Sequence, residues 1–279
     1  MGMITKAGRE KISLKNLFRT IKYKINFRME NPEYFDADGL FIFVGSQGTG
    51  KTLSAVNYTC KLLEMYPNSK LVTNLLLSDY PIVTFDNYLI NNYKQYGDEI
   101  SNVDKDKVYD DYLKYNRVFP FNNNDDFKLY NNGQNGVIFF VDEIQLYLNS
   151  LESKNVNIET VAQISQQRKQ RKHIVATSQV FGRMAKPLRE QFSNVVKCKC
   201  FAGVMQNNAL IDRDSIDDDD STGTNISGKV KHRFVWFHSP EMYKRYDTYY
   251  VIEKGKFVGG EAQKGGLYNN DLRLSIDNK

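Results

Sequence analysis

The amino-acid sequence predicts an α/β fold with a mostly parallel central sheet flanked by helices, and three observations predict it. An apolar run at 40–44 leads through a glycine-rich turn into helical spacing over 52–66. The unbroken apolar run 137–141 has the composition of a central strand that is covered on both faces. A helical pattern over 158–172 precedes a further strand at 173–177, and such alternation favours right-handed βαβ units.

Composition narrows the class of protein. The 279 residues suffice for one α/β domain with appendages, and 41% hydrophobic and 25% charged residues are ordinary globular usage. No apolar run approaches the roughly 18 residues that span a bilayer, and the amino terminus lacks the apolar core of a signal peptide. Three cysteines are too few for a disulfide framework. These features predict a cytoplasmic protein.

The remaining elements are expected from shorter patterns. Residues 71–73 and 82–84 are typical of strands, as are 234–237 and 249–252 near the carboxyl end. The long polar stretch 87–136 is rich in Asn, Asp and Tyr, and we expect helical pieces and loops there.

The chain is expected to divide into a short amino-terminal helix, a main domain and a tail. Residues 1–30 are basic, and apolar residues recur at helical spacing over 12–28, which predicts an amphipathic helix. It could lie on the main domain, a neighbouring subunit, DNA or a membrane surface. Residues 31–255 form the main domain, with the polar insertion at 87–136 and a mobile acidic loop at 212–229. Residues 256–279 are a polar tail.

The glycine-rich turn matches the phosphate-binding pattern G-x-x-x-x-G-K-[ST] at every fixed position. Its residues are Gly45, Ser46, Gln47, Gly48, Thr49, Gly50, Lys51 and Thr52. Glycines let the backbone N–H groups turn inward at a helix amino terminus, where they bind an anion. Lys51 would contact the β- and γ-phosphates, and Thr52 would offer its hydroxyl to Mg²⁺. The sequence therefore predicts a P-loop NTPase that binds ATP.

A carboxylate pair, Asp142–Glu143, follows the apolar run 137–141. A carboxylate that leaves a buried strand can hold Mg²⁺, as Walker B aspartates do, so Asp142 is the second candidate metal ligand. Glu143 is placed to polarise a water for attack on the γ-phosphate. The pair favours hydrolysis over kinase or GTPase chemistry, and no guanine-reading N-K-x-D follows.

Further candidates surround the strand at 173–177. In additional-strand ATPases a polar residue after this strand touches the γ-phosphate or the lytic water, and Gln179 is the candidate here. Ring ATPases also use a cation, often from the next subunit, to neutralise charge in the transition state. Arg168 and Arg171 are the favoured arginine fingers; a salt bridge or a contact to DNA is the alternative for each.

Several separated segments together resemble the FtsK–HerA branch of P-loop ATPases, which is RecA-like in fold. More narrowly, the chain looks like zonula occludens toxin-like (Zot) and phage packaging ATPases. The resemblance rests on the P-loop, Lys70–Asn74, Val141–Gln145, Gln167–Lys172, Thr177–Gln179 and Met242–Thr248.

The resemblance implies an ATP-driven translocase of double-stranded DNA, a ring of subunits that packages a viral genome in the cytoplasm of a bacterial host. Capsid or portal proteins would then be partners. One alternative is a Zot-like ATPase that extrudes filamentous phage at the inner membrane; such proteins usually carry a transmembrane segment after the ATPase domain, and none is seen in this sequence. Another is an ATP-switched scaffold, against which Glu143 argues, because a pure binder does not need it.

Overall fold

The computed structural model describes most of the chain in two units. The residues described are 14–32, 34–37, 39–93, 105–148, 164, 166, 169–184, 186–216 and 226–246. The units are Met1–Tyr34 and Phe35–Lys279. The predicted polar tail at 256–279, the predicted strand at 249–252 and Arg168 lie outside the described residues, as does most of the predicted helix 158–172.

The first unit contains the helix α2, Leu14–Glu30. It buries no side chain, and its apolar residues Leu14, Phe18 and Met29 are largely exposed. At its carboxyl end the Asn31 side chain donates a hydrogen bond to the Phe27 carbonyl (2.9 Å). The amphipathic helix predicted within 1–30 is therefore present, and it runs two residues beyond the carboxyl end of the periodic pattern.

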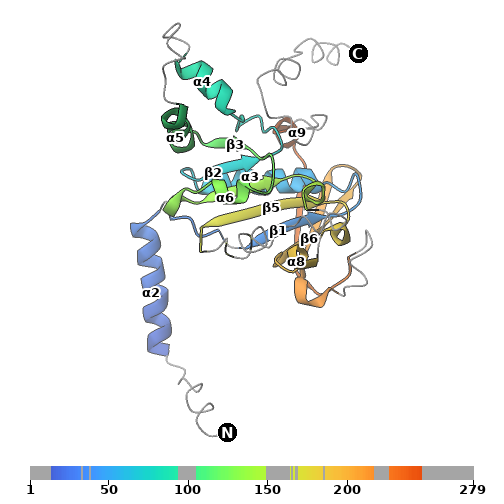
Figure 1. Ribbon diagram of the computed structural model, residues 1–279. Helices are drawn as coiled ribbons and strands as arrows, with labels where there is room; N and C mark the ends of the chain where they lie inside the picture. Colours follow the sequence, from blue (N-terminus) through green and yellow to red (C-terminus); the bar gives the residue numbers. More distant parts are fainter. Residues whose placement is uncertain are drawn as a thin grey trace. The chain divides into compact units, whose positions relative to one another are not determined.

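The second unit is built on one eight-stranded sheet (Figure 1). Its strands are β1 (Leu40–Val44), β2 (Lys70–Thr73), β3 (Val118–Pro120), β4 (Val137–Val141), β5 (Lys172–Ser178), β6 (Asn194–Phe201), β7 (Met205–Asp212) and β8 (Val230–Phe237). They lie in the order β3-β2-β4-β5-β1-β6-β7-β8. Neighbours from β3 to β6 are parallel, and β7 and β8 add an antiparallel hairpin. The sheet is thus mostly parallel, as predicted.

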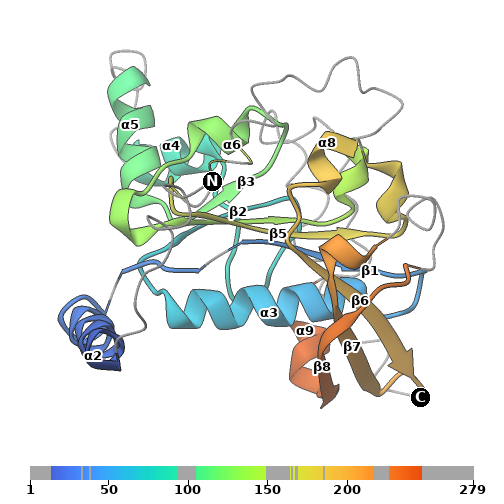
Figure 2. The ribbon, with the colours of Figure 1, turned by 90° about the horizontal axis from the view of Figure 1, so that it is seen from below.

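Helices cover both faces of the parallel strands. They are α3 (Lys51–Met65), α4 (Phe85–Tyr93), α5 (Lys105–Tyr115), α6 (Asp126–Leu129), α8 (Lys186–Arg189) and α9 (Pro240–Lys244). Single 3₁₀ turns lie at Gly133–Asn135, Ile144–Leu146, Phe181–Arg183 and Arg213–Ser215. Figure 2 shows α3 on one face of the sheet and α5, α6 and α8 on the other. Among the described residues, no helix has the length and apolarity that crossing a membrane requires.

Alternation along each strand divides the core into two layers. In β4 the side chains of Val137, Phe139 and Val141 pack into the layer with α5, α6 and α8, while Ile138 and Phe140 pack into the layer with α3. All five are fully buried, because successive side chains of a strand point to opposite faces and both faces are covered. This explains why the sequence of β4 is an unbroken apolar run.

Three expectations from the sequence are corrected. Residues 82–84 are not a strand; Val83 makes one backbone bond to Val118, and its carbonyl instead accepts side-chain bonds from Tyr112 and Asn116. The stretch 87–136 is not only helices and loops, since it supplies β3 to the sheet. Lys172 belongs to β5 rather than to a preceding helix.

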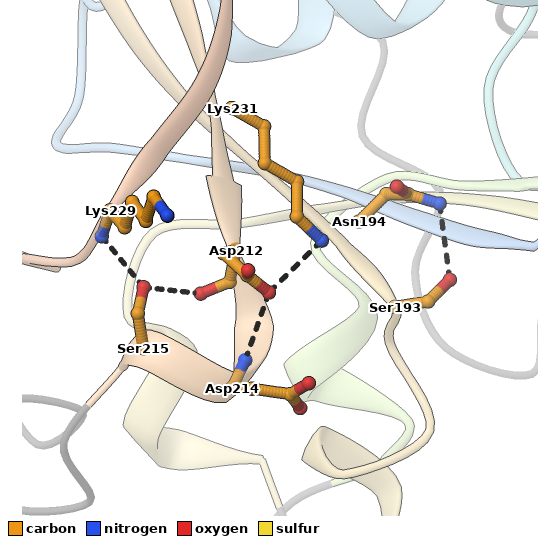
Figure 3. Close-up of polar contacts among 7 residues, drawn as sticks. All are labelled: Ser193, Asn194, Asp212, Asp214, Ser215, Lys229 and Lys231. Atoms are coloured by element: carbon orange, nitrogen blue, oxygen red, sulfur yellow. Dashed lines mark hydrogen bonds and ion pairs between the residues drawn. The ribbon is translucent and has the colours of Figure 1, made fainter.

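The described ends of the predicted acidic loop 212–229 are tied together by a small polar cluster (Figure 3). Asp212 forms an ion pair with Lys231 (2.9 Å) and accepts a bond from the Asp214 N–H. The Ser215 hydroxyl donates to the Asp212 carbonyl (2.7 Å) and accepts from the Lys229 N–H (2.6 Å). The pKa of Asp212 lies below its usual value, chiefly because of the bond from Lys231. Residues 217–225 of the loop lie outside the described residues.

Candidate nucleotide-binding site

The glycine-rich loop joins the carboxyl end of β1 to the first turn of α3. Gly48 and Gly50 adopt positive φ angles (78° and 75°), which glycine reaches without strain. Gly50 caps α3 through its carbonyl, which accepts the Ser54 N–H (2.9 Å). Thr49 closes the loop internally, since its hydroxyl donates to the Ser46 carbonyl (2.7 Å). The loop therefore has the conformation in which backbone N–H groups can surround an anion.

Lys51 is directed into this loop. Its side chain is only 6% exposed, and its ammonium group donates to the Ser46 carbonyl (3.3 Å). A buried ammonium held by one carbonyl needs further partners, because a desolvated charge is costly unless it is paired. Phosphate oxygens in the loop would supply them.

Asp142 lies beside the loop although it is distant in sequence. Its carboxylate atom Oδ1 accepts hydrogen bonds from two hydroxyl groups, those of Thr52 (3.0 Å) and Thr177 (2.7 Å). The contacts follow from strand order, because β5 lies between β1 and β4 and the parallel strands all end at the same edge. The two predicted metal ligands, Thr52 and Asp142, are thus adjacent. This order, with one strand between the P-loop strand and the Walker B strand, is that of additional-strand ATPases.

The main chain of Asp142 is held by Asn74, which follows β2. The Asn74 side chain donates to the Asp142 carbonyl (2.8 Å) and accepts from the Asp142 N–H (2.8 Å). The same amide group contacts the Tyr147 hydroxyl (3.4 Å). Asn74 therefore fixes the peptide groups on both sides of the Asp142 side chain, and with them the direction of its carboxylate.

Glu143 is held in a left-handed backbone conformation (φ 50°), which is uncommon for a residue other than glycine. Its N–H donates to the Thr177 hydroxyl (2.9 Å). Gln179 donates to carboxylate atom Oε1 (3.0 Å), and Gln145 donates to Oε2. Strain of this kind persists only where surrounding contacts over-determine it, and it gathers at functional sites.

The oxygen atoms of this site fit Mg²⁺. Loss of solvent around the carboxylate raises the pKa of Asp142 above its usual value, while hydrogen bonds from Thr177 and Thr52 oppose the rise. A bound cation would favour the charged form. Mg²⁺ prefers oxygen ligands and commonly takes one or two protein groups together with phosphates. Thr52 and Asp142 would therefore hold the ion together with phosphate oxygens.

Of the two predicted arginine fingers, the structure describes Arg171, and that residue does not join this site within one chain. Arg171 immediately precedes β5 and Gln179 immediately follows it, so the length of the strand, about 25 Å, separates the two residues. Its guanidinium contacts the Gln134 carbonyl (3.5 Å), and its backbone has a positive φ (52°). Arg168 lies outside the described residues. Action on a neighbouring subunit stays a prediction for both.

The structure brings together Lys51, Thr52, Asp142, Glu143 and Gln179 from separate parts of the chain. The site also contains three residues for which no role was predicted from the sequence, Asn74, Thr177 and Gln145. A signal was present for the first two, since each stands at the carboxyl end of a strand of a parallel sheet, where such folds bind ligands. Their position at a strand end does not, however, show that they contact Asp142 and Glu143.

No family model matches the chain, and no curated protein sequence matches it. Solved structures that are similar include the N-terminal domain of zonular occludens toxin from Neisseria meningitidis (16% identity, TM-score 0.47, 75% of this chain and 98% of that one). The genome packaging NTPase B204 from Sulfolobus turreted icosahedral virus 2, bound to ATP-gammaS, is 12% identical (TM-score 0.43, 73% and 98%). The DNA-packaging ATPase B204 from Sulfolobus turreted icosahedral virus is also 12% identical (TM-score 0.40, 58% and 76%). The strand order and the loop between β1 and α3 themselves give this chain the fold of a P-loop NTPase.

Proposed function

We propose that the chain is a Mg²⁺-dependent ATPase that translocates double-stranded DNA, as a viral genome-packaging motor does. The observation that supports hydrolysis is the contact between the P-loop and the acidic pair. Thr52 lies in the first turn of α3 and contacts Asp142 (3.0 Å), which brings Glu143 to the same end of the sheet. A site that only bound nucleotide would not need the second carboxylate.

Each side chain has a distinct task in the proposed reaction. Residues 45–52 and the Lys51 ammonium bind the phosphates, while Thr52 and Asp142 would hold Mg²⁺, which neutralises phosphate charge when it is bound. Glu143 orients a water and accepts its proton as the water oxygen bonds to the γ-phosphorus. The bond from that phosphorus to the bridging oxygen breaks, and ADP and phosphate leave.

Gln179 would orient the Glu143 carboxylate. Its amide holds one carboxylate oxygen of Glu143. A water that hydrogen-bonds to the same oxygen would sit beside the Gln179 amide, so Gln179 can orient both. The cation that completes the transition state would come from a neighbouring subunit, and Arg171 and Arg168 remain the proposed sources.

The sequence is the basis for proposing that the protein binds DNA and works as a ring of subunits. The chain carries a formal charge of +5, and its segments resemble those of translocating ATPases. Contacts would run mainly to phosphates, so affinity for duplex DNA should fall steeply with salt. A salt slope near zero would remove DNA from the proposal while leaving the ATPase untouched.

The test is ATP turnover with and without duplex DNA, run beside a size measurement in ATP. Lys51→Ala should abolish nucleotide binding, because the variant loses the charge that pairs with phosphate. Glu143→Gln should still bind ATP but hydrolyse it roughly 10²–10⁴-fold more slowly. Normal turnover by both variants would refute the site.

Matched controls come from the same helix. Lys61→Ala and Glu64→Gln change exposed residues of α3 that lie away from the loop, and both should turn over ATP like the wild type. Loss of activity in these controls would point to damage of α3 rather than to chemistry.

A second candidate function has one observation in its favour. The helix α2 carries five basic residues and an apolar face with no buried side chain, as helices at a membrane surface do. This suits the Zot-like ATPase acting at an inner membrane. Firm membrane association on fractionation, without DNA-stimulated turnover, would favour it over the DNA motor.

A further inference from the structure

A buried polar chain connects the phosphate-binding loop to the β7–β8 hairpin. Gln206 of β7 is fully buried, and its amide nitrogen donates to the Thr49 carbonyl (2.8 Å) and to Asn208 Oδ1 (2.8 Å). Asn208 in turn donates to the Ser54 hydroxyl on α3 (3.0 Å). Because successive strand residues alternate in direction, Gln206 and Asn208 both point from β7 to the loop and the first turns of the helix.

The oxygen of the Gln206 amide faces His238, the residue that follows β8. This oxygen, Oε1, lies 3.3 Å from His238 Nε2. Two acceptor oxygens surround the Gln206 nitrogen, so the amide orientation is fixed and the His238 ring nitrogen must donate. His238 Nδ1 lies 2.5 Å from the Tyr243 hydroxyl, and the same hydroxyl lies 2.9 Å from the Gly203 carbonyl. Both ends of the Gln206 amide are therefore held, and the side chain cannot turn without breaking these bonds.

The bond to Thr49 has a direct consequence for the loop. Thr49 C=O and Gly50 N–H belong to one trans peptide, in which the two groups point in opposite directions. Because Gln206 holds the carbonyl on the β7 side, the Gly50 N–H points away from β7. In a P-loop the backbone N–H groups surround the α- and β-phosphates, so an N–H that is turned away from β7 is available to them.

Gln206 also restricts what can occupy position 50. A Cβ added at Gly50 would collide with the Gln206 amide, which lies against the α-carbon. Glycine is thus required there by this neighbour as well as by its positive φ angle (75°). The loop and β7 fit each other at this point.

We propose that Gln206 is a positioning residue for phosphate binding: it fixes the Thr49–Gly50 peptide so that the Gly50 N–H faces the β-phosphate. His238 and Asn208 hold Gln206 in place. The inference rests on the proposed nucleotide binding and adds a contribution from the hairpin, which lies outside the P-loop motif.

The experiment measures the affinity of the full chain for ATP, ADP and AMP in the presence of Mg²⁺, by calorimetry. Gln206→Met keeps the length of the side chain and removes its donor. We expect ATP and ADP to bind about ten-fold more weakly, which corresponds to about 1.4 kcal/mol, because one oriented N–H to the β-phosphate is lost. AMP has no β-phosphate and should bind as it does to the wild type.

Kinetics give a readout that loss of stability alone would not move. KM for ATP should rise about ten-fold, while kcat at saturating ATP changes by less than about two-fold, because the lost interaction is present in the ground state and in the transition state. The matched control is Ile211→Val, which disturbs a buried residue of the same strand away from the loop. It should lower the melting temperature and leave every affinity unchanged.

A milder variant covers the possibility that Gln206→Met does not fold. His238→Phe changes a half-buried side chain and leaves the Gln206–Thr49 bond without its support, so ADP should bind about two- to three-fold more weakly. If the folded variants bind ADP like the wild type, or lose ADP and AMP equally, the inference is overturned. If the wild type itself binds no nucleotide, the proposed function fails instead.

Discussion

The two halves of the sheet differ in how they are covered. In the parallel half every residue of β4 and β5 is buried, because helices pack on both faces. In the antiparallel half the outer strand β8 buries no residue. For this reason β4 is a continuous apolar run in the sequence, which β8 is not.

The two parts of the sheet contribute differently to stability and to the site. Buried strands supply the hydrophobic free energy and hold Asp142 and Glu143 at their ends, whereas the hairpin contributes a few polar contacts to the loop, through Gln206. Regions with few buried apolar side chains open at lower free energy than the core. We therefore expect large stability effects in the parallel half and small ones in β8.

The largest effect is expected in the parallel half. Phe139 of β4 is 0% exposed and packs against the ring of Phe127 (centroids 5.0 Å apart). Phe139→Ala should lower the free energy of unfolding by about 3–5 kcal/mol, because it leaves a cavity between sheet and helices. Urea denaturation measures it. A loss below about 1 kcal/mol, which is typical of a surface site, would contradict the conclusion that the parallel strands supply most of the stability.

A smaller effect is expected at the strand ends. Asn74→Leu leaves the N–H and the carbonyl of Asp142 without their partner, which should cost about 2–3 kcal/mol in a partly exposed site. Hydrolysis should fall further than stability explains, because the Asp142 carboxylate loses its orientation. Asn74→Asp is the comparison variant and should lose less activity, since aspartate can still accept a hydrogen bond from the Asp142 N–H. Equal turnover by Asn74→Leu and wild type would contradict the role of Asn74.

A pH effect is expected from His173 in β5. Burial lowers its pKa from 6.5 to about 4. Between these values the unfolded chain binds a proton that the folded chain does not, so stability falls as pH drops below about 6.5, by at most about 1.4 kcal/mol per pH unit. Stability measured from pH 7 to pH 5 tests this. His173→Gln should flatten the pH dependence, and an unchanged slope would show that other groups cause it.

The smallest effect is expected in β8. Phe237 is 71% exposed, so Phe237→Ser should change the free energy of unfolding by less than about 0.5 kcal/mol. Thermal and urea denaturation of the isolated chain measure it. A loss comparable to that of Phe139→Ala would mean that β8 is covered in solution and that the two halves are alike.

Much of the fold could be predicted from local patterns. The apolar run 137–141 is β4, and the strand expected at 234–237 lies within β8. The strand β7 was not expected, because Gln206 and Asn208 are polar at buried positions and break the alternation that identifies a strand. The extended segment 82–84 looked like a strand but lacks a full ladder of backbone bonds, which depends on a neighbour that the segment itself does not specify.

The phosphate loop at 45–52 and the acidic pair after a buried strand could be identified from the sequence alone, because glycine content, charge and apolar periodicity are local properties. The strand order could be learned only from the folded chain. The same holds for the contacts of Asn74 to Asp142 and of Gln206 to Thr49, which join residues 68 and 157 positions apart. These contacts could not be predicted because a polar side chain at a strand end can hydrogen-bond to many partners. Only the packing of the sheet selects the partner it meets.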